Sequence, residues 1–124
     1  MENFGKSILF RVAALFLALV AVQNASAAPW VNTGGLNLAR NSHTATLLPN
    51  GLVLVTGGIS TTIVAKAELY NPVTESWFAT RSLHAPRQLH TATLLRNGEV
   101  LIAAGKSTNG VDTASAELGV RVAQ

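Results

Sequence analysis

The 124-residue chain contains no cysteine, and only 12% of its residues are charged. The first absence excludes disulfides, thiolate metal sites and thiol catalysis. The shortage of charge, together with a hydrophobic content of 48%, excludes a disordered tail. Nine Lys and Arg against six Asp and Glu give a net charge of +3 without any basic run, so the sequence predicts no nucleic-acid partner.

The one long hydrophobic run lies near the N-terminus. The cations Lys6 and Arg11 precede an apolar run over residues 12–22, and small residues follow as far as Ala27. A positive start, an apolar run of about 7–15 residues and a small-residue site are the parts of a secretory signal peptide. We therefore predict a helical signal peptide over residues 1–27, cleaved after Ala27.

An uncleaved N-terminal anchor is the alternative, although the run is shorter than the roughly 20 residues that span a bilayer. Cleavage would leave residues 28–124 as the mature protein, secreted or periplasmic and without membrane contact. Seven basic and five acidic residues lie in this part of the chain. Small exported domains are usually stabilised by disulfides. Because this chain has no cysteine, its stability must come from apolar packing and backbone pairing.

Beyond the leader, the chain repeats itself at an offset of 47 residues. Segments 30–58 and 77–105 share 15 identities over 29 aligned positions, including the run His-Thr-Ala-Thr-Leu-Leu that begins at His43 and at His90. After the glycines that end these segments the offset becomes 49, so that Glu68 aligns with Glu117. The repeats therefore span about 30–76 and 77–124. A period of about 40–50 residues is typical of β-propeller blades.

Each repeat predicts four short strands. In the first, polar and apolar residues alternate from His43 to Leu48, a β-branched run follows the turn at Asn50-Gly51, and a third strand covers 65–70. Trp77 opens the fourth strand. The Asn-Gly pair of the turn Pro49-Asn50-Gly51 predicts a hairpin with a type I′ turn. The sequence thus predicts an all-β fold, a partial β-propeller of about two four-stranded antiparallel blades, preceded by the signal helix.

This pattern resembles the kelch repeat. Gly57-Gly58 stands at the position of the family's double glycine, Tyr70 precedes an Asn-Pro turn, and Trp77 follows it. The resemblance is to the secreted bacterial kelch proteins grouped with galactose-oxidase-like propellers, and it covers residues 30–118. The second copy departs from the pattern, because Ala104 replaces one glycine and Gly119 replaces the tyrosine.

The resemblance implies a ring of about 4–8 blades, so two repeats imply an incomplete ring. In closed kelch rings a terminal strand from one end often completes the blade at the other end. A strand opened by Trp30 is expected to play this part. The family's oxidase members use copper beside a tyrosine joined to a cysteine. Without cysteine this chemistry does not carry over, and we expect no cofactor and no metal.

Recurrence at the repeat period predicts structural roles for most of the conspicuous side chains. They are Trp30, His43, Gly57, Gly58, Glu68, Tyr70, Trp77, His90, Gly105 and Glu117. For the two tryptophans we expect inter-blade core rather than sugar stacking. For His43 and His90 a structural role is favoured over metal binding or general-base catalysis.

Three residues are candidates for ligand binding: Arg40, His84 and Arg87. The guanidinium groups could grip a carboxylate or a sugar hydroxyl. The favoured alternative is that each arginine holds a loop of the next blade by hydrogen bonds to backbone carbonyls. His84 has no counterpart in the first repeat and is expected in a solvated loop, where binding residues concentrate.

No catalytic constellation emerges from the sequence. We therefore expect an exported, non-catalytic binding or scaffold module that recognises protein or carbohydrate. One alternative is a truncated fragment of a larger kelch propeller, either a galactose-oxidase-like enzyme or a receptor, without activity of its own. Another is a secreted hydrolase that uses His84, Glu99 or Asp112. The open sheet edges could mediate self-association.

Overall fold

The computed structural model describes residues 27–119. The chain divides into two units, Met1–Asn32 and Thr33–Gln124, which we describe separately. The predicted leader helix lies outside the described residues. Residues 27–32 of the first unit contain neither helix nor strand.

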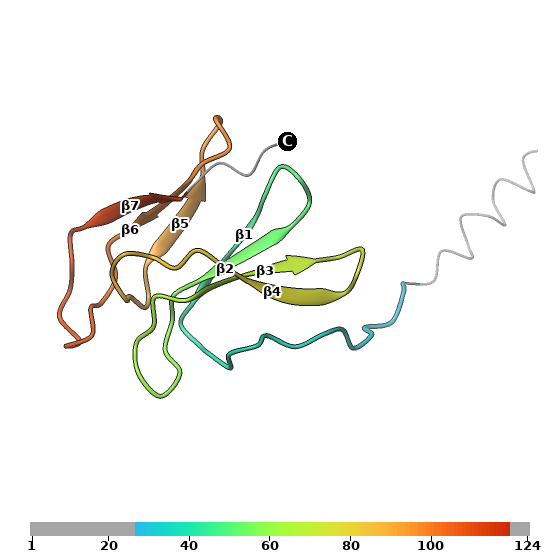
Figure 1. The fold of residues 1–124 in the computed structure, drawn as a ribbon, viewed down its shortest axis with the longest axis horizontal. Coiled ribbons are helices and arrows are strands. Elements are labelled where there is room, and N and C mark those ends of the chain that lie inside the picture. Colours follow the sequence, from blue (N-terminus) through green and yellow to red (C-terminus); the bar gives the residue numbers. More distant parts are fainter. Residues whose placement is uncertain (1–26, 120–124) are drawn as a thin grey trace, which may run out of the picture. The chain divides into compact units, whose positions relative to one another are not determined.

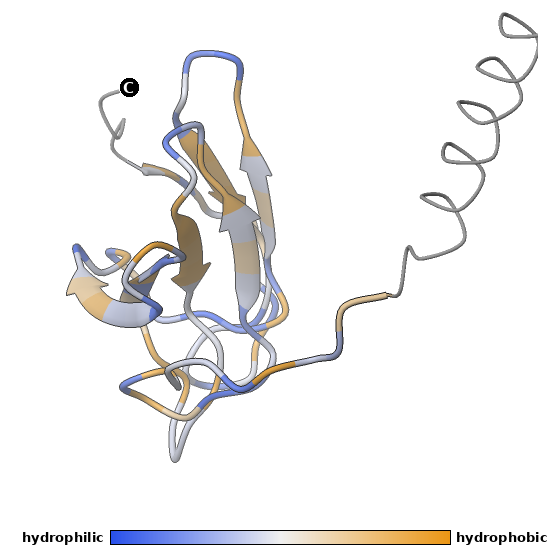
Figure 2. Ribbon diagram, turned by 90° about the vertical axis from the view of Figure 1, so that its right-hand side faces the viewer, coloured by the Kyte–Doolittle hydropathy of each residue, from blue (hydrophilic) through white to orange (hydrophobic). Residues whose placement is uncertain are grey.

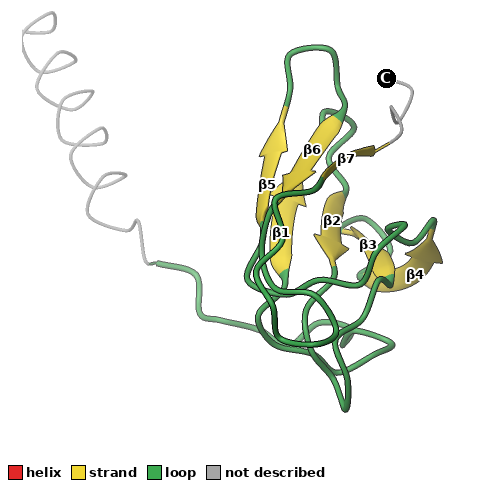
Figure 3. Cartoon of the chain, turned by 90° about the vertical axis from the view of Figure 1, so that its left-hand side faces the viewer, coloured by secondary structure: helices red, strands yellow, loops and turns green. Residues whose placement is uncertain are grey.

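The described part of the second unit is all-β. Its strands form two antiparallel sheets, one of four strands in the order β1-β2-β3-β4 and one of three in the order β5-β6-β7 (Figure 1). Their bounds are β1 Thr44–Leu47, β2 Val53–Thr56, β3 Ala67–Asn71, β4 Ser76–Thr80, β5 Thr91–Leu94, β6 Val100–Ala103 and β7 Ala116–Gly119. The first strands of the two sheets, β1 and β5, lie side by side (Figure 3).

Alternation of residue type gives each sheet two distinct faces, and bands of contrasting hydropathy cross the strands in Figure 2. Leu54 of β2 pairs with Leu69 of β3, whereas their neighbours Val55 and Glu68 pair with each other on the opposite face. The same registers recur in the second sheet, where Ile102 pairs with Glu117.

The Asn-Gly turns differ from the predicted type I′ hairpin. Gly51 and Gly98 have positive φ values of 84° and 83°, but the asparagines before them do not. The amide of Gly51 donates to the carbonyl of Leu48 at 2.9 Å, and the Leu48 amide donates to Leu52 at 2.8 Å. This is a three-residue loop that needs only one left-handed residue. The prediction of a type I′ turn is therefore wrong, because only the glycine of each Asn-Gly pair has a positive φ.

The second sheet has three strands, whereas four were predicted. Trp30, expected to open a further strand, lies in a segment without strand structure, and its side chain is fully exposed. Its repeat counterpart, Trp77, is the second residue of β4 and pairs with Tyr70 of β3. A strand needs such a neighbour for its backbone hydrogen bonds.

The core lies between the two sheets. It contains Leu48 and Leu69 from the first repeat and Val100 and Ile102 from the second, each at most 7% exposed. Partly buried Leu52, Leu54, Leu83 and Ala92 pack against them. The blades therefore stabilise each other through one face of each sheet.

The double glycine allows the two blades to approach closely. A Cβ on Gly57 would lie 2.5 Å from the carbonyl oxygen of Arg87 and 2.7 Å from the ring of His90. The Gly58 amide donates to the same Arg87 carbonyl at 2.8 Å. Both glycines also have positive φ. The predicted structural role of this pair therefore has a steric basis, since any side chain at Gly57 would push the blades apart.

Candidate functional site

A buried ion pair braces the first blade. The Arg40 guanidinium donates to Glu68 Oε1 at 2.6 Å, and the two side chains are 0% and 4% exposed. The same guanidinium donates to the carbonyls of Gly57 and Lys66, at 3.2 and 2.6 Å. The sheet, the β2–β3 loop and the segment before β1 are thus joined by one side chain.

The Glu68 carboxylate also accepts backbone hydrogen bonds. The amides of Asn37 and Leu38 donate to its two oxygens at 2.8 and 3.2 Å, and the Asn37 side chain adds a further bond. Burial by itself would raise the pKa of Glu68. The hydrogen bonds from Asn37 and Leu38 and the Arg40 charge outweigh it, so the pKa lies below its ordinary value.

The second blade repeats this brace. Arg87 donates to Glu117 Oε1 at 3.0 Å and to the carbonyls of Ala104 and Ser115. The amides of His84 and Ala85 donate to the Glu117 carboxylate. Burial again raises the pKa of Glu117, and the hydrogen bonds of His84, Ala85 and Arg87 lower it by more.

Both arginines bond backbone carbonyls, as the sequence analysis favoured, but these carbonyls lie in the arginine's own repeat, so the expected contact with a loop of the next blade is wrong. Their side chains are almost fully buried, so a ligand could reach neither without dismantling the blade. The repeated glutamates could be recognised in the sequence from their shared repeat position. The amides that bind them could not, because backbone donors leave no mark in residue identity.

His90 lies at the junction between the blades. It is 5% exposed, and its Nε2 lies 2.8 Å from Thr44 Oγ1 and 3.2 Å from Thr56 Oγ1, both in the first blade. Burial lowers its pKa, and the Arg87 and His43 charges lower it further. His43 holds the same repeat position but is exposed. His43 and His90 thus occupy the same place in their repeats but differ in burial.

The tryptophans are not inter-blade core. Trp77 is half-buried against Tyr70, with ring centroids 5.0 Å apart, and its Nε1 donates to the carbonyl of Gly34 at 2.8 Å. Tyr70 Oη lies 2.5 Å from Thr33 Oγ1. These contacts attach the segment before β1 to the β3–β4 edge. The core prediction is wrong for both residues, and most plainly for the exposed Trp30.

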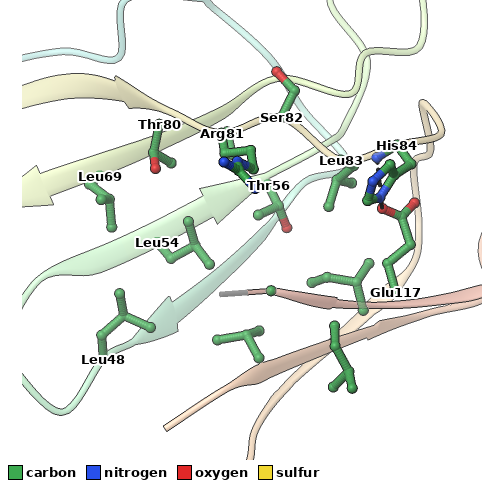
Figure 4. Close-up of a pocket in the computed structure, with 15 residues that line it drawn as sticks. Leu48, Leu54, Thr56, Leu69, Thr80, Arg81, Ser82, Leu83, His84 and Glu117 are labelled. Atoms are coloured by element: carbon green, nitrogen blue, oxygen red, sulfur yellow. Dashed lines mark hydrogen bonds and ion pairs between the residues drawn. The ribbon is translucent and has the colours of Figure 1, made fainter. Parts of the chain in front are cut away.

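A cavity of about 140 Å³ lies between the two sheets (Figure 4). Its lining includes the apolar residues Leu69 and Val100, and also Gly119. Polar groups of Thr80, Arg81, Ser82, His84 and Glu117 also line it. Its volume is well below the roughly 300–1,000 Å³ of pockets for drug-sized ligands.

His84 is the one exposed member of the three candidate binding residues. Its side chain is 93% exposed, and Nδ1 lies 3.0 Å from Glu117 Oε2, the contact drawn in Figure 4. The other residues considered for hydrolysis bond elsewhere: Glu99 accepts from Asn97, and Asp112 pairs with Lys106 at 2.6 Å. Within residues 27–119, no hydrogen bond joins His84, Glu99 and Asp112 to one another.

The β2–β3 and β6–β7 loops extend from corresponding ends of the two sheets (Figure 1). Exposed Thr61 and Thr62 lie in the first loop, and exposed Thr108 and Asn109 in the second. Their hydroxyl and amide groups can donate and accept hydrogen bonds. These loops differ between the repeats in sequence and length, unlike the strands that carry them.

Two classes of site are absent from the part of the chain that the structure describes. Residues 27–119 hold no cluster of three His, Cys, Asp or Glu side chains that could bind a metal ion. They also contain no helix with the length and hydrophobicity needed to cross a bilayer.

The fold is similar to that of a solved kelch-repeat propeller protein, in the structure titled "Structure of YjhT". The match has a TM-score of 0.60 and 21% sequence identity, and it covers 65% of this chain. It spans only 25% of the other chain, so these blades correspond to part of that propeller. No protein-family model matches the sequence, and no curated protein matches it.

Proposed function

We propose that this chain is an exported, non-catalytic binding or scaffold module whose kelch-type blades present recognition loops for protein or carbohydrate. One observation carries the proposal: the arginines and glutamates that recur in the repeats, together with His90, are used to build the blades. Arg40, Glu68, Arg87 and Glu117 form the two braces, and His90 joins the blades. A rigid support of this kind suits variable loops, because binding residues concentrate on loops that a scaffold positions.

The candidate recognition surface consists of the β2–β3 and β6–β7 loops, with residues 59–65 and 106–114. Two isolated bridges, Ile59 to Ile63 and Lys106 to Asp112, fold these loops back on themselves. Preorganised loops lose less conformational entropy when they bind a ligand. The exposed hydroxyl and amide groups between the bridges are suited to the hydroxyls of a sugar or the backbone of a peptide.

Backbone-amide NMR titration of the protein tests this proposal. The probes are chito-oligosaccharide, cello-oligosaccharide and oligogalacturonate, followed by a soluble protein extract of the cell envelope. We expect shifts confined to the two loops, reduced by Asn109→Ala. Thr74→Ala is the matched control, because Thr74 is exposed in the β3–β4 turn at the opposite end of the sheet. Absence of loop shifts with every probe, or shortening of an added oligosaccharide, would count against a non-catalytic module.

The partial coverage of the matched propeller favours a second candidate. The chain would then be part of a larger kelch propeller, a galactose-oxidase-like enzyme or receptor, without activity of its own. Sequencing the DNA that follows the codon for Gln124, in all frames, distinguishes the two. Further copies of the His-Thr-Ala-Thr-Leu-Leu run would support the larger propeller, and their absence would leave the two-blade module.

A further inference from the structure

The second sheet has an unfilled edge. β7 pairs only with β6, whereas its repeat counterpart β3 pairs with strands on both sides. No other strand among residues 27–119 covers this edge, and Leu118 on β7 is 57% exposed. An unpaired edge presents free backbone donors and acceptors to another strand.

The chain also contains an unused copy of the strand that fills the corresponding edge in the first blade. β4 spans Ser76–Thr80, and residues 29–33 align with it at the repeat offset, with tryptophan and threonine conserved between the copies. In the structure this copy forms no strand. Trp30 is fully exposed and Val31 is 79% exposed, although both are apolar.

We propose that residues 30–33 of one copy of this chain pair with β7 of a second copy, and that the Trp30 indole enters the cavity between the second copy's sheets. The register follows from the β3–β4 pairing, in which Tyr70 lies opposite Trp77 and Ala67 opposite Thr80. Carried over by the repeat, it sets Trp30 opposite Gly119 and Thr33 opposite Ala116.

This register aims Trp30 at the cavity. Residues directly opposite each other in antiparallel strands project from the same face. Gly119 pairs with Val100, whose buried side chain faces the first sheet. Both residues line the cavity, together with Leu69. Trp30 opposite Gly119 therefore projects toward the first sheet.

The cavity has a suitable size and composition for an aromatic side chain. Its volume is about 140 Å³, close to the ~150 Å³ of an apolar protein cavity that takes up benzene. In the first blade Tyr70 packs against Trp77 at this position. In the second blade Gly119 has no side chain, which leaves room for the indole.

We assign this strand to another copy, because Asn37 and Leu38, which follow residues 30–33 in the same chain, are held on the far side of the first sheet. Glu68 and Leu69 are neighbours in β3 and so point to opposite faces. Leu69 packs toward the second sheet, whereas Glu68 holds the amides of Asn37 and Leu38 on the other face. Pairing with a second copy keeps those bonds.

The inferred contact is the exchange of one edge strand and does not continue the internal stacking of blades. At the internal junction the Arg87 carbonyl lies where a Cβ on Gly57 would collide with it. The equivalent position in the second blade is Ala104, which has that Cβ. The inference does not depend on which ligand the loops bind.

Disulfide trapping tests the register, since the natural chain has no cysteine to interfere. Full-length Val31→Cys and Leu118→Cys variants, expressed with their own leader and recovered after export, are mixed and oxidised. We expect a mixed dimer linked through positions 31 and 118. Asn32→Cys with Leu118→Cys is the matched control, because a one-residue shift places the side chains on opposite faces. Equal linkage in both mixtures, or none in the first, would overturn the proposal.

Light scattering over a range of concentrations tests the role of the indole. We expect Trp30→Ala to weaken self-association by about 30-fold or more, as for an aromatic hot spot. The side chain is fully exposed in the single chain, so its loss leaves the fold intact, which circular dichroism would verify. Val73→Ala, at an exposed site on the β3–β4 turn, should associate like the natural chain. A natural chain that stays monomeric at all concentrations would contradict the proposal.

Discussion

Gly57 and Ala104 occupy the same repeat position with almost the same backbone angle, φ values of 61° and 59°, but only Gly57 has a neighbouring blade against it. Ala104 is exposed. The left-handed conformation is thus a feature of each blade, whereas the close approach occurs only at the junction between the blades. Substitutions at the two positions separate these effects.

We expect Ala104→Gly to stabilise the protein by about 1 kcal/mol, because an L-residue in the left-handed region carries a penalty of about 1–2 kcal/mol. Ala103→Gly, one residue earlier in β6, should instead destabilise by about 0.5–1 kcal/mol, since glycine weakens an ordinary strand. Urea unfolding measures both free energies. Two equal effects would show that φ at Ala104 is unimportant.

Gly57→Ala should destabilise by about 2 kcal/mol or more. The new methyl group adds left-handed strain and meets the Arg87 carbonyl. The control is Gly51→Ala, because Gly51 also has a positive φ but no atom lies within 4 Å of the added Cβ. The urea midpoints of the two variants are compared. The excess loss in Gly57→Ala measures the junction, and no excess would mean that the blades separate readily.

Glu68→Gln should cost about 3 kcal/mol, because it leaves the buried Arg40 charge without its partner. Glu117→Gln should cost less, since Glu117 is 12% exposed against 4% for Glu68. Glu75→Gln changes the same charge at an exposed turn and should remain within about 0.5 kcal/mol of the natural protein. Chemical denaturation at neutral pH ranks the three, and the reverse order of the two buried sites would contradict the difference in burial.

Acid should destabilise the protein in two stages. The pKa of His90 in the folded state lies below its ordinary 6.5, so the unfolded chain takes up a proton first and stability falls as the pH drops below about 6.5. The lowered pKa values of Glu68 and Glu117 add a second loss below about pH 4.5.

His90→Gln should remove the first stage and leave the second. Thermal melts at pH 8, 6 and 5 measure the slope. His43→Gln should reduce the first stage only in part, because the His43 charge is the last of the three causes that lower the pKa of His90. If the stability of the natural protein did not change between pH 7 and 5, the predicted contribution of His90 would be wrong.

Ile102→Ala should destabilise by about 2–5 kcal/mol, as expected for a buried aliphatic side chain. Leu47→Ala also shortens an aliphatic side chain to a methyl group, but at a site that is 64% exposed. It should therefore destabilise the protein far less than Ile102→Ala. Guanidinium unfolding provides both values. Similar losses would mean that the inter-sheet core is not the main source of stability.

The strands were predictable because each follows from local pattern and turn chemistry. β1, β2, β5 and β6 all lie within the predicted runs, since the repeated alternation around Asn-Gly is a short-range signal. The pairing of the Arg and Glu residues was not predicted, because it joins positions about 30 residues apart in the chain. The expected Trp30 strand failed for a related reason: its sequence is suitable, but strand formation depends on a neighbour that sequence periodicity cannot supply.

Each brace lies wholly within one repeat. Asn37, Arg40 and Glu68 fall inside residues 30–76, and His84, Arg87 and Glu117 fall inside 77–124. A tandem gene duplication cut just before the tryptophan codon would therefore copy a complete brace. The same cut separates β3 from β4. Every added copy would therefore contain a complete brace, but its fourth strand would be encoded by the sequence that follows it. Growth by such duplications makes each new unit depend on its successor for its last strand.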